Sequence, residues 1–202
     1  MSADHYFTKK PASKDQLRPL KVTLAGRDLT LTTASGVFSA DRIDLGTRVL
    51  LRAAEKLPKR GNLLDLGCGW GPLALTMALE RPKTTVWAVD INERAVDLVR
   101  RNSALAGVTN IRAMAPQDVP DSLTFDAIWS NPPIRIGKQT LHELLDTWLA
   151  RLNPEGTATL VVQRNLGADS LQAWLAAQNP NFTVERAGSA KGYRVLRIVR
   201  LA

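Results

Sequence analysis

The sequence predicts an α/β protein with a doubly wound, seven-stranded and mostly parallel sheet. From residue 61 onward, short apolar runs alternate with segments of helical apolar spacing, and a glycine-rich turn joins the first run to the first helix. Such alternation produces a parallel sheet with helices on both faces. The last two apolar runs follow each other without a helix, so one C-terminal strand is expected to be antiparallel.

Residues 1–35 are expected to form an arm and a small β-hairpin, followed by one domain over 36–202. The arm, 1–19, is polar and basic and contains two prolines. Apolar and polar residues alternate over 21–24 and 29–32 on both sides of a glycine-containing turn, which predicts the hairpin.

Each later element has its own signal. Helical spacing predicts a helix over 43–57, capped by Asp41 and stopped by Pro58. Pro72 suits the first turn of the next helix. We expect strands over 62–65, 85–90, 110–114, 125–130 and 157–163, helices over 72–80, 93–105, 138–152 and 168–177, and final strands over 182–187 and 193–201 joined through Gly188 and Gly192.

The chain is basic, with 27 Lys and Arg against 19 Asp and Glu and a formal net charge of +8. The basic residues are densest in the N-terminal arm and hairpin and in the tail after residue 185. They can be an ordinary solvated surface, or they can attract a polyanion such as a nucleic acid in a salt-dependent way.

Other compositional features exclude several classes of site. Cys68 is the only cysteine, so neither an intramolecular disulfide nor a cysteine metal site is expected, and a reducing cytoplasmic compartment fits. His5 and His142 lack metal-ligand spacing, so no metal is expected. We expect neither a signal peptide nor a membrane-spanning segment, because the chain has no suitable apolar stretch.

A glycine-rich loop follows the first expected strand of the sheet. In Asp65-Leu-Gly-Cys-Gly-Trp-Gly71, the glycines at 67, 69 and 71 let the backbone approach a ligand closely. The spacing is not the dinucleotide fingerprint, whose third glycine would fall on Pro72. Asp65 would repel a pyrophosphate but favour an ammonium, so the loop fits a cofactor with an amino-acid head. Cys68 is expected to be only a small residue there.

Candidate nucleoside contacts follow the next two strands. Asp90 ends one strand and is positioned to accept hydrogen bonds from ribose hydroxyls, and Ile91 is positioned to pack on an adenine face. Gln117 and Asp118, after the third strand, are candidates for contacts to the adenine edge. The alternative is that Asp90, Gln117 and Asp118 are only turn or capping residues.

Asn131-Pro-Pro133 ends the apolar run 125–130. The prolines stop the strand, which places Asn131 at its carboxyl tip, where open α/β sheets bind ligands. The Asn131 side-chain oxygen and the Pro132 carbonyl can accept both N–H groups of a planar amine, as methyl transfer to such an amine requires. The alternative is a plain turn. Arg135 and Lys138 can bind phosphates at the pocket mouth or be surface charges.

Together these motifs resemble class I S-adenosylmethionine-dependent methyltransferases, most closely the guanine-N2 methyltransferases of small-subunit ribosomal RNA. The closer resemblance rests on Gly36-Val-Phe-Ser39, Asp44-Leu-Gly-Thr47, 131–138 and Lys191-Gly-Tyr-Arg-Val-Leu196, and it covers roughly residues 5–200. It implies S-adenosyl-L-methionine as the cofactor, with Phe38, Asp44 and Thr47 covering it from one side. From the residues alone, these three can equally be a core aromatic and a helix-start pair.

Two features depart from the family pattern. Longer members carry an additional N-terminal domain, which we expect this chain to lack, so a monomer or a homodimer is possible. Many amino-directed methyltransferases have an aromatic residue where this chain has Ile134, so base stacking would have to come from elsewhere, with Phe38 and Tyr193 as candidates, or be weaker.

The resemblance implies methylation of a guanine exocyclic amine in ribosomal RNA, free or in the small subunit. One alternative keeps the cofactor but methylates a protein glutamine amide or another RNA or DNA amino group. A second, of a different class, is a non-catalytic RNA-binding assembly protein.

Overall fold

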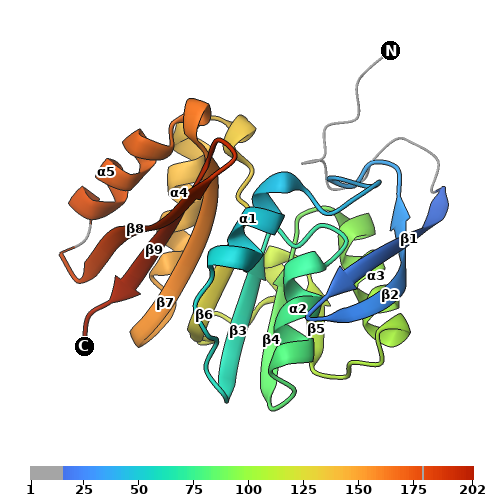
Figure 1. Ribbon diagram of the computed structural model, residues 1–202. Coiled ribbons are helices and arrows are strands. Elements are labelled where there is room, and N and C mark those ends of the chain that lie inside the picture. The colour runs from blue at the N-terminus through green and yellow to red at the C-terminus, as the bar shows by residue number, and fades with distance from the viewer. Residues whose placement is uncertain (1–15, 179) are drawn as a thin grey trace.

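In the computed structural model, which describes residues 16–178 and 180–202, a mixed sheet has the strand order β5-β4-β3-β6-β7-β9-β8 (Figure 1). Strands β3 to β7 pair in parallel, and β9 lies antiparallel between β7 and β8. This confirms the predicted fold class. The strands are β3 (Gly61–Leu66), β4 (Thr84–Val89), β5 (Ile111–Met114), β6 (Phe125–Ser130), β7 (Leu152–Gln163), β8 (Phe182–Ala190) and β9 (Tyr193–Arg200).

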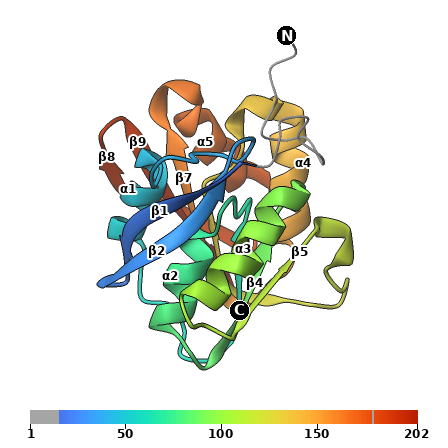
Figure 2. The ribbon, with the colours of Figure 1, turned by 90° about the vertical axis from the view of Figure 1, so that its right-hand side faces the viewer.

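Five α-helices cover the two faces of the sheet in the described part of the chain (Figures 1 and 2). Alternate strand residues serve opposite layers: Leu63 packs with α1 to α3, and Leu64 packs with α4 and α5. No helix of the described residues is both long and apolar enough to cross a bilayer. The helices are α1 (Leu45–Ala53), α2 (Pro72–Glu80), α3 (Glu93–Leu105), α4 (Lys138–Leu149) and α5 (Ala168–Gln178), with short 3-10 turns at Pro116–Asp118, Ile134–Ile136 and Arg164–Leu166.

The predicted hairpin is present as β1 (Leu17–Leu24) and β2 (Arg27–Ala34), and it lies across α2 and α3 (Figure 2). It is longer than expected: residues 17–19, assigned to the arm, pair with 32–34. Residues 17–19 stay exposed, but Thr33 and Ala34 on the opposite strand are buried, which anchors the added pairing. Residues 1–15 of the arm lie outside the described residues. A domain boundary after residue 35 stays a prediction.

The cap and both ends of α1 differ from the prediction. Asp44, not Asp41, caps the helix: its Oδ2 accepts hydrogen bonds from the backbone N–H groups of Gly46 at 2.7 Å and Thr47 at 3.3 Å. The helix ends at Ala53 because Ala54 is extended, with ψ 140°. The extended chain places Leu57 in the core, where it is 5% exposed, instead of in the helix.

The prediction that α4 runs to residue 152 and is closed by 153–156 is also wrong. The helix ends at Leu149, and Leu152 already pairs with Phe125 in the sheet. Residues 153–156 form an irregularity within β7, where the pairing register shifts. Leu152 is fully buried, so the core pulls it into the strand.

Gly188, predicted to lie in the last turn, is inside β8 at a register shift, and the turn is formed by Lys191 and Gly192. A Cβ at residue 188 would lie 3.3 Å from the Cβ of Ala53. The glycine therefore lets the bulged strand come close to α1.

Asn102 joins the hairpin to the sheet domain. Its Oδ1 accepts from the Thr32 N–H at 2.7 Å, and its Nδ2 donates to the carbonyls of Thr32 and Trp70, each at 2.9 Å. The side chain is fully buried, so its loss would leave backbone groups without partners.

We therefore expect Asn102→Ala to lower the free energy of unfolding by about 2–4 kcal/mol, measured by urea denaturation. The adjacent Ser103→Ala removes one local bond to the Val99 carbonyl and should cost less than about 1 kcal/mol. Equal losses in the two variants would contradict the role given to Asn102.

Candidate active site

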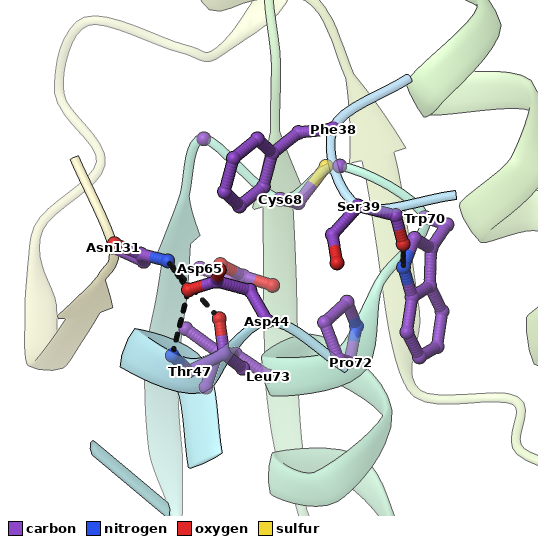
Figure 3. A pocket seen from close by; sticks show the side chains of 12 residues that line it. Phe38, Ser39, Asp44, Thr47, Asp65, Cys68, Trp70, Pro72, Leu73 and Asn131 are labelled. Atoms are coloured by element: carbon purple, nitrogen blue, oxygen red, sulfur yellow. Dashed lines mark hydrogen bonds between the residues drawn. The ribbon is translucent and has the colours of Figure 1, made fainter. Parts of the chain in front are cut away.

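A cavity at the carboxyl edge of the sheet brings together three segments that are distant in sequence (Figure 3). They are the chain leading into α1, the glycine loop after β3, and the residue that follows β6. The cavity is narrow, about 30 Å³. Its lining includes these residues named from the sequence: Phe38, Asp44, Thr47, Asp65, Gly67, Cys68, Gly69 and Asn131.

The Asn131 carboxamide is held by the start of α1. Its Nδ2 donates to Asp44 Oδ2 at 2.9 Å and to Thr47 Oγ1 at 3.2 Å. Asp44 Oδ2 can only accept, so this contact fixes which end of the amide is the nitrogen. The amide oxygen is turned away from Asp44, and no group in the described chain donates to it.

The three loop glycines all have left-handed backbone angles, with φ between 55° and 97°, but their surroundings differ. A Cβ at Gly71 would lie 3.0 Å from Val99, so this glycine serves the packing of α2 on α3. Around Gly67 and Gly69 a Cβ would meet no atom within 4 Å. These two glycines therefore leave open space over the backbone that a ligand can fill.

Asp65 is fully buried at the floor of the cavity (Figure 3). Its Oδ2 accepts from the Ala74 N–H in the first turn of α2 at 2.8 Å, but among the described residues no donor reaches Oδ1. Burial raises the pKa of Asp65 to about 7, the Ala74 N–H opposes this, and Asp90 adds to it. A buried carboxylate oxygen without a donor fits an ammonium group.

Asp90 holds the loop in place. One carboxylate oxygen accepts from the Gly69 N–H and the other from the Asn92 N–H, each at 2.9 Å. Burial raises the pKa of Asp90, and these N–H bonds oppose the rise. The turn role weighed for Asp90 is thus present. The Ile91 N–H also bonds this carboxylate, which leaves one lone pair for a ribose hydroxyl.

The roof of the cavity involves residues that the sequence analysis missed. Trp70 Nε1 donates to the Ser39 carbonyl at 3.1 Å, and Asn92 Nδ2 donates to the Gly36 carbonyl at 2.9 Å. These bonds tie the segment 36–39 to the glycine loop and to the start of α3. Pro72 and Leu73 complete the lining. The sequence did offer one indication that Trp70 belongs to the site, namely its position between two glycines of the loop.

The carbonyl groups of the two prolines after Asn131 already accept hydrogen bonds from nearby backbone N–H groups. The Pro132 carbonyl accepts from the Ile134 N–H at 2.9 Å, so one of its two lone pairs is left for a substrate. Ile134 packs against the core beside α4. The Pro133 carbonyl accepts from the Ile136 N–H at 3.2 Å. Arg135 and Lys138 are exposed.

Tyr193 lies against the first turn of α1. A Cβ at Gly46 would be 2.9 Å from both Tyr193 Cε1 and Asp44 Oδ2, so a glycine is needed for this contact. Burial and the Asp44 charge raise the pKa of Tyr193. Tyr193 is thus beside the group that holds Asn131 without lining the cavity itself.

Of the remaining candidates, Phe38 and Cys68 line the cavity, whereas Ile91, Gln117 and Asp118 do not. Ile91 is 45% exposed, and Phe38, which does line the cavity, is 44% exposed rather than in the core. Gln117 and Asp118 are exposed on the 3-10 turn after β5. Burial raises the pKa of Cys68, which makes it a poor nucleophile. Within residues 16–178 and 180–202, no group of three or more His, Cys, Asp or Glu side chains is arranged to hold a metal.

Comparison with solved structures points to methyltransferases. A T. thermophilus 16S rRNA N2 methyltransferase (RsmC), solved in complex with AdoMet and guanosine, superposes with a TM-score of 0.79 at 25% identity, over 95% of this chain and 52% of that chain. TrmN from Thermus thermophilus superposes with a TM-score of 0.58 at 26% identity, over 78% of this chain and 48% of that chain.

Among sequence relatives, the uncharacterized protein YbxB of Bacillus subtilis is 35% identical over 83% of this chain and 85% of its own length. Ribosomal RNA small subunit methyltransferase C of Pseudoalteromonas translucida is 32% identical over 83% of this chain and 49% of its own. The chain thus spans about half the length of this methyltransferase C relative. The family model described as methyltransferase small domain matches residues 28–197. The chain belongs to this family of S-adenosylmethionine-dependent methyltransferases.

Proposed function

We propose that the protein transfers a methyl group from S-adenosyl-L-methionine to the exocyclic N2 amine of a guanine in small-subunit ribosomal RNA. The observation that carries this proposal is the Asn131 carboxamide, which Asp44 and Thr47 hold at the cavity that the glycine loop also lines. The proposal that ribosomal RNA is the substrate is supported by the net charge of +8 and by the relatives named as ribosomal RNA methyltransferases. We place the reaction in the cytoplasm, with the protein acting as a monomer or a homodimer.

The residues at the cavity match the chemical groups of the cofactor, and the cavity itself, about 30 Å³, has room for only a small part of it. Asp65 would accept a hydrogen bond from its ammonium group through Oδ1, and Gly67 and Gly69 would lie against its amino-acid part. Asp90 would accept from a ribose hydroxyl, with Ile91 against the adenine and Gln117 or Asp118 at its edge. Phe38, Asp44 and Thr47 would cover the opposite side. The cofactor supplies an electrophilic methyl group on a sulfonium.

Asn131 and Pro132 would orient the acceptor amine. The Asn131 side-chain oxygen and the remaining lone pair of the Pro132 carbonyl would each accept one N–H, which directs the nitrogen lone pair at the methyl carbon. The methyl group would pass from sulfur to nitrogen, with the S–C bond breaking as the N–C bond forms, and the amine proton would leave to water. These acceptors stabilise the positive charge that grows on nitrogen in the transition state. Arg135 and Lys138 would contact phosphates.

The direct test is methyl transfer from labelled S-adenosylmethionine to small ribosomal subunits, and to their naked RNA, from a strain that lacks the protein. We expect label on the N2 of one guanine. Label on another amino group, or on a protein glutamine amide, would show that the enzyme uses the same cofactor but a different acceptor. Absence of transfer to any acceptor, with RNA binding intact, would favour a non-catalytic assembly protein.

Asn131→Ala should lower the turnover number about 10²–10³-fold, because loss of one preorganised transition-state contact has this effect in other enzymes. Binding of S-adenosylhomocysteine, measured by calorimetry, should change little. Gln139→Ala is the control, because this exposed amide bonds only Glu143 on α4 in the described chain. Near-normal turnover of Asn131→Ala would remove this residue from the mechanism.

The affinity for S-adenosylmethionine should fall as the pH drops below about 7, the pKa of Asp65 without ligand. Below that pH the carboxyl is protonated, and the ammonium can bind only when the proton leaves, so the affinity should fall by up to about tenfold per pH unit. Calorimetric titrations at pH 5.5, 6.5 and 7.5 measure this. A flat profile would show that the ammonium does not bind Asp65.

Asp65→Asn should separate ligand binding from stability. The raised pKa means that the charged carboxylate destabilises the fold, and this cost grows as the pH rises from 3.8 to about 7. An amide keeps an oxygen for the Ala74 N–H and carries no charge. At pH 8 the variant should therefore melt at least about 2–4 °C higher, the shift for 1 kcal/mol in a domain of this size, while cofactor affinity is lost. A lower melting temperature would indicate a purely structural carboxylate.

A further inference from the structure

A second cavity, of about 210 Å³, lies between α1 and the β8–β9 hairpin. Its volume is many times the roughly 10–15 Å³ that one water needs on the same measure, so a phosphate group of five heavy atoms fits. Helix α1 contributes one wall, and the other wall is residues 188–191, where the bulge at Gly188 brings β8 close to the helix. This cavity shares no lining residue with the candidate active site.

The lining is basic. Arg48, Arg52 and Lys191 contribute to it, and no acidic residue does. Arg48 and Arg52 are four residues apart, so they lie on the same side of α1. Like charges at this spacing destabilise a helix by about 0.2–0.5 kcal/mol. An anion bound between them would relieve the repulsion.

Within the described chain, Arg48, Arg52 and Lys191 have no acidic partner, whereas several arginines of the β8–β9 hairpin do. Arg186 and Arg194 pair with Asp169, and Arg197 pairs with Glu55 and Glu185. Across the residues that the structure describes, neither an ion pair nor a side-chain hydrogen bond neutralises Arg48, Arg52 or Lys191. The one nearby acid on the α1 side, Glu55, is used by Arg197 at 3.0 Å. The positive charge is therefore concentrated in the cavity.

The cavity adjoins the candidate active site. Asp44 and Thr47 line the active-site cavity, and their chain neighbours Leu45 and Arg48 line the basic one. Lys191 is at the turn before Tyr193, which contacts Gly46 in the same helical turn. Arg52 is one further turn, about 6 Å, along the helix. A strand with one base at Asn131 would therefore pass this cavity with a neighbouring phosphate.

We propose that the cavity between α1 and the β8–β9 hairpin, through Arg48, Arg52 and Lys191, binds backbone phosphates of the RNA strand that carries the target guanine. This inference rests on the proposed function, because it takes the RNA strand as the substrate. Arginine suits the role, since its guanidinium binds phosphate oxygens in a bidentate way. Contacts to phosphates position a strand without reading its sequence.

The test compares Arg48→Ala/Arg52→Ala with Lys59→Ala/Arg60→Ala. Both double variants remove two exposed positive charges, but Lys59 and Arg60 precede β3, at the opposite edge of the sheet. Binding of a fluorescein-labelled single-stranded RNA that carries the target sequence is measured by anisotropy from 50 to 300 mM KCl. Binding of S-adenosylhomocysteine and the melting temperature serve as controls and should not change for either variant.

For Arg48→Ala/Arg52→Ala we expect affinity to fall about 10–30-fold at 100 mM salt and the slope of log K against log salt to shrink by about 1.4, or 0.7 for each lost phosphate contact. The control pair should bind like the wild type. An RNA with neutral methylphosphonate linkages beside the target should bind the wild type and the variant equally. Methyl transfer by the variant should show a raised KM for RNA with little change in kcat. Arg48→Lys/Arg52→Lys should keep the wild-type salt slope but bind less tightly, because lysine cannot bind a phosphate in a bidentate way.

Wild-type affinity and slope in Arg48→Ala/Arg52→Ala, or equal losses in both pairs, would overturn the proposal. So would a loss of affinity only for an acidic ribosomal protein, with naked RNA unaffected. Failure of the proposed function is distinguishable: the wild type would then methylate no guanine, whereas failure of this inference leaves guanine methylation intact in both double variants.

Discussion

The site depends on the Asp44 carboxylate, which has two tasks at once. Its Oδ2 caps α1 through the backbone of Gly46 and Thr47, and the same oxygen accepts from Asn131 Nδ2. The side chain that starts a helix thus fixes the direction of the amide. Through this oxygen Asp44 holds Asn131 beside the cavity, with the amide oxygen turned away.

Asp65 illustrates a different constraint, in which stability is given up for binding. A fully buried carboxylate with one unpaired oxygen is unfavourable, and its pKa rises to about 7 for that reason. The single N–H of Ala74 compensates only in part. Strain of this kind is expected at a site whose missing partner is supplied by a ligand. The surrounding strand and helix are regular, so the cost is confined to one side chain.

Much of this arrangement could be predicted from sequence because it depends on local chemistry and on strand periodicity. Pro72 at a helix start and two prolines after β6 fix element ends almost regardless of context, and these bounds were right. The ends of α1 and α4 were wrong because the buried core draws Leu57 and Leu152 out of the helical pattern, and periodicity alone cannot show this.

Within the site, the residues brought together by the sheet edge were foreseeable, since carboxyl ends of parallel strands meet there. The bond from Asn131 to Asp44 and the roof bond from Trp70 to Ser39 were not, because they join residues through long-range packing. The basic cavity was equally hidden. Its cations are scattered over two segments, and only the pairing of the neighbouring arginines with acids reveals which charges are left over.

The first turn of α1 is a wall shared by two cavities: Asp44 and Thr47 line the candidate active site, and Leu45 and Arg48 line the basic cavity. Because the two cavities share this wall, a substitution that displaces the turn would change the shape of both. The effect of a variant in this turn therefore has to be measured at both cavities, not at one alone.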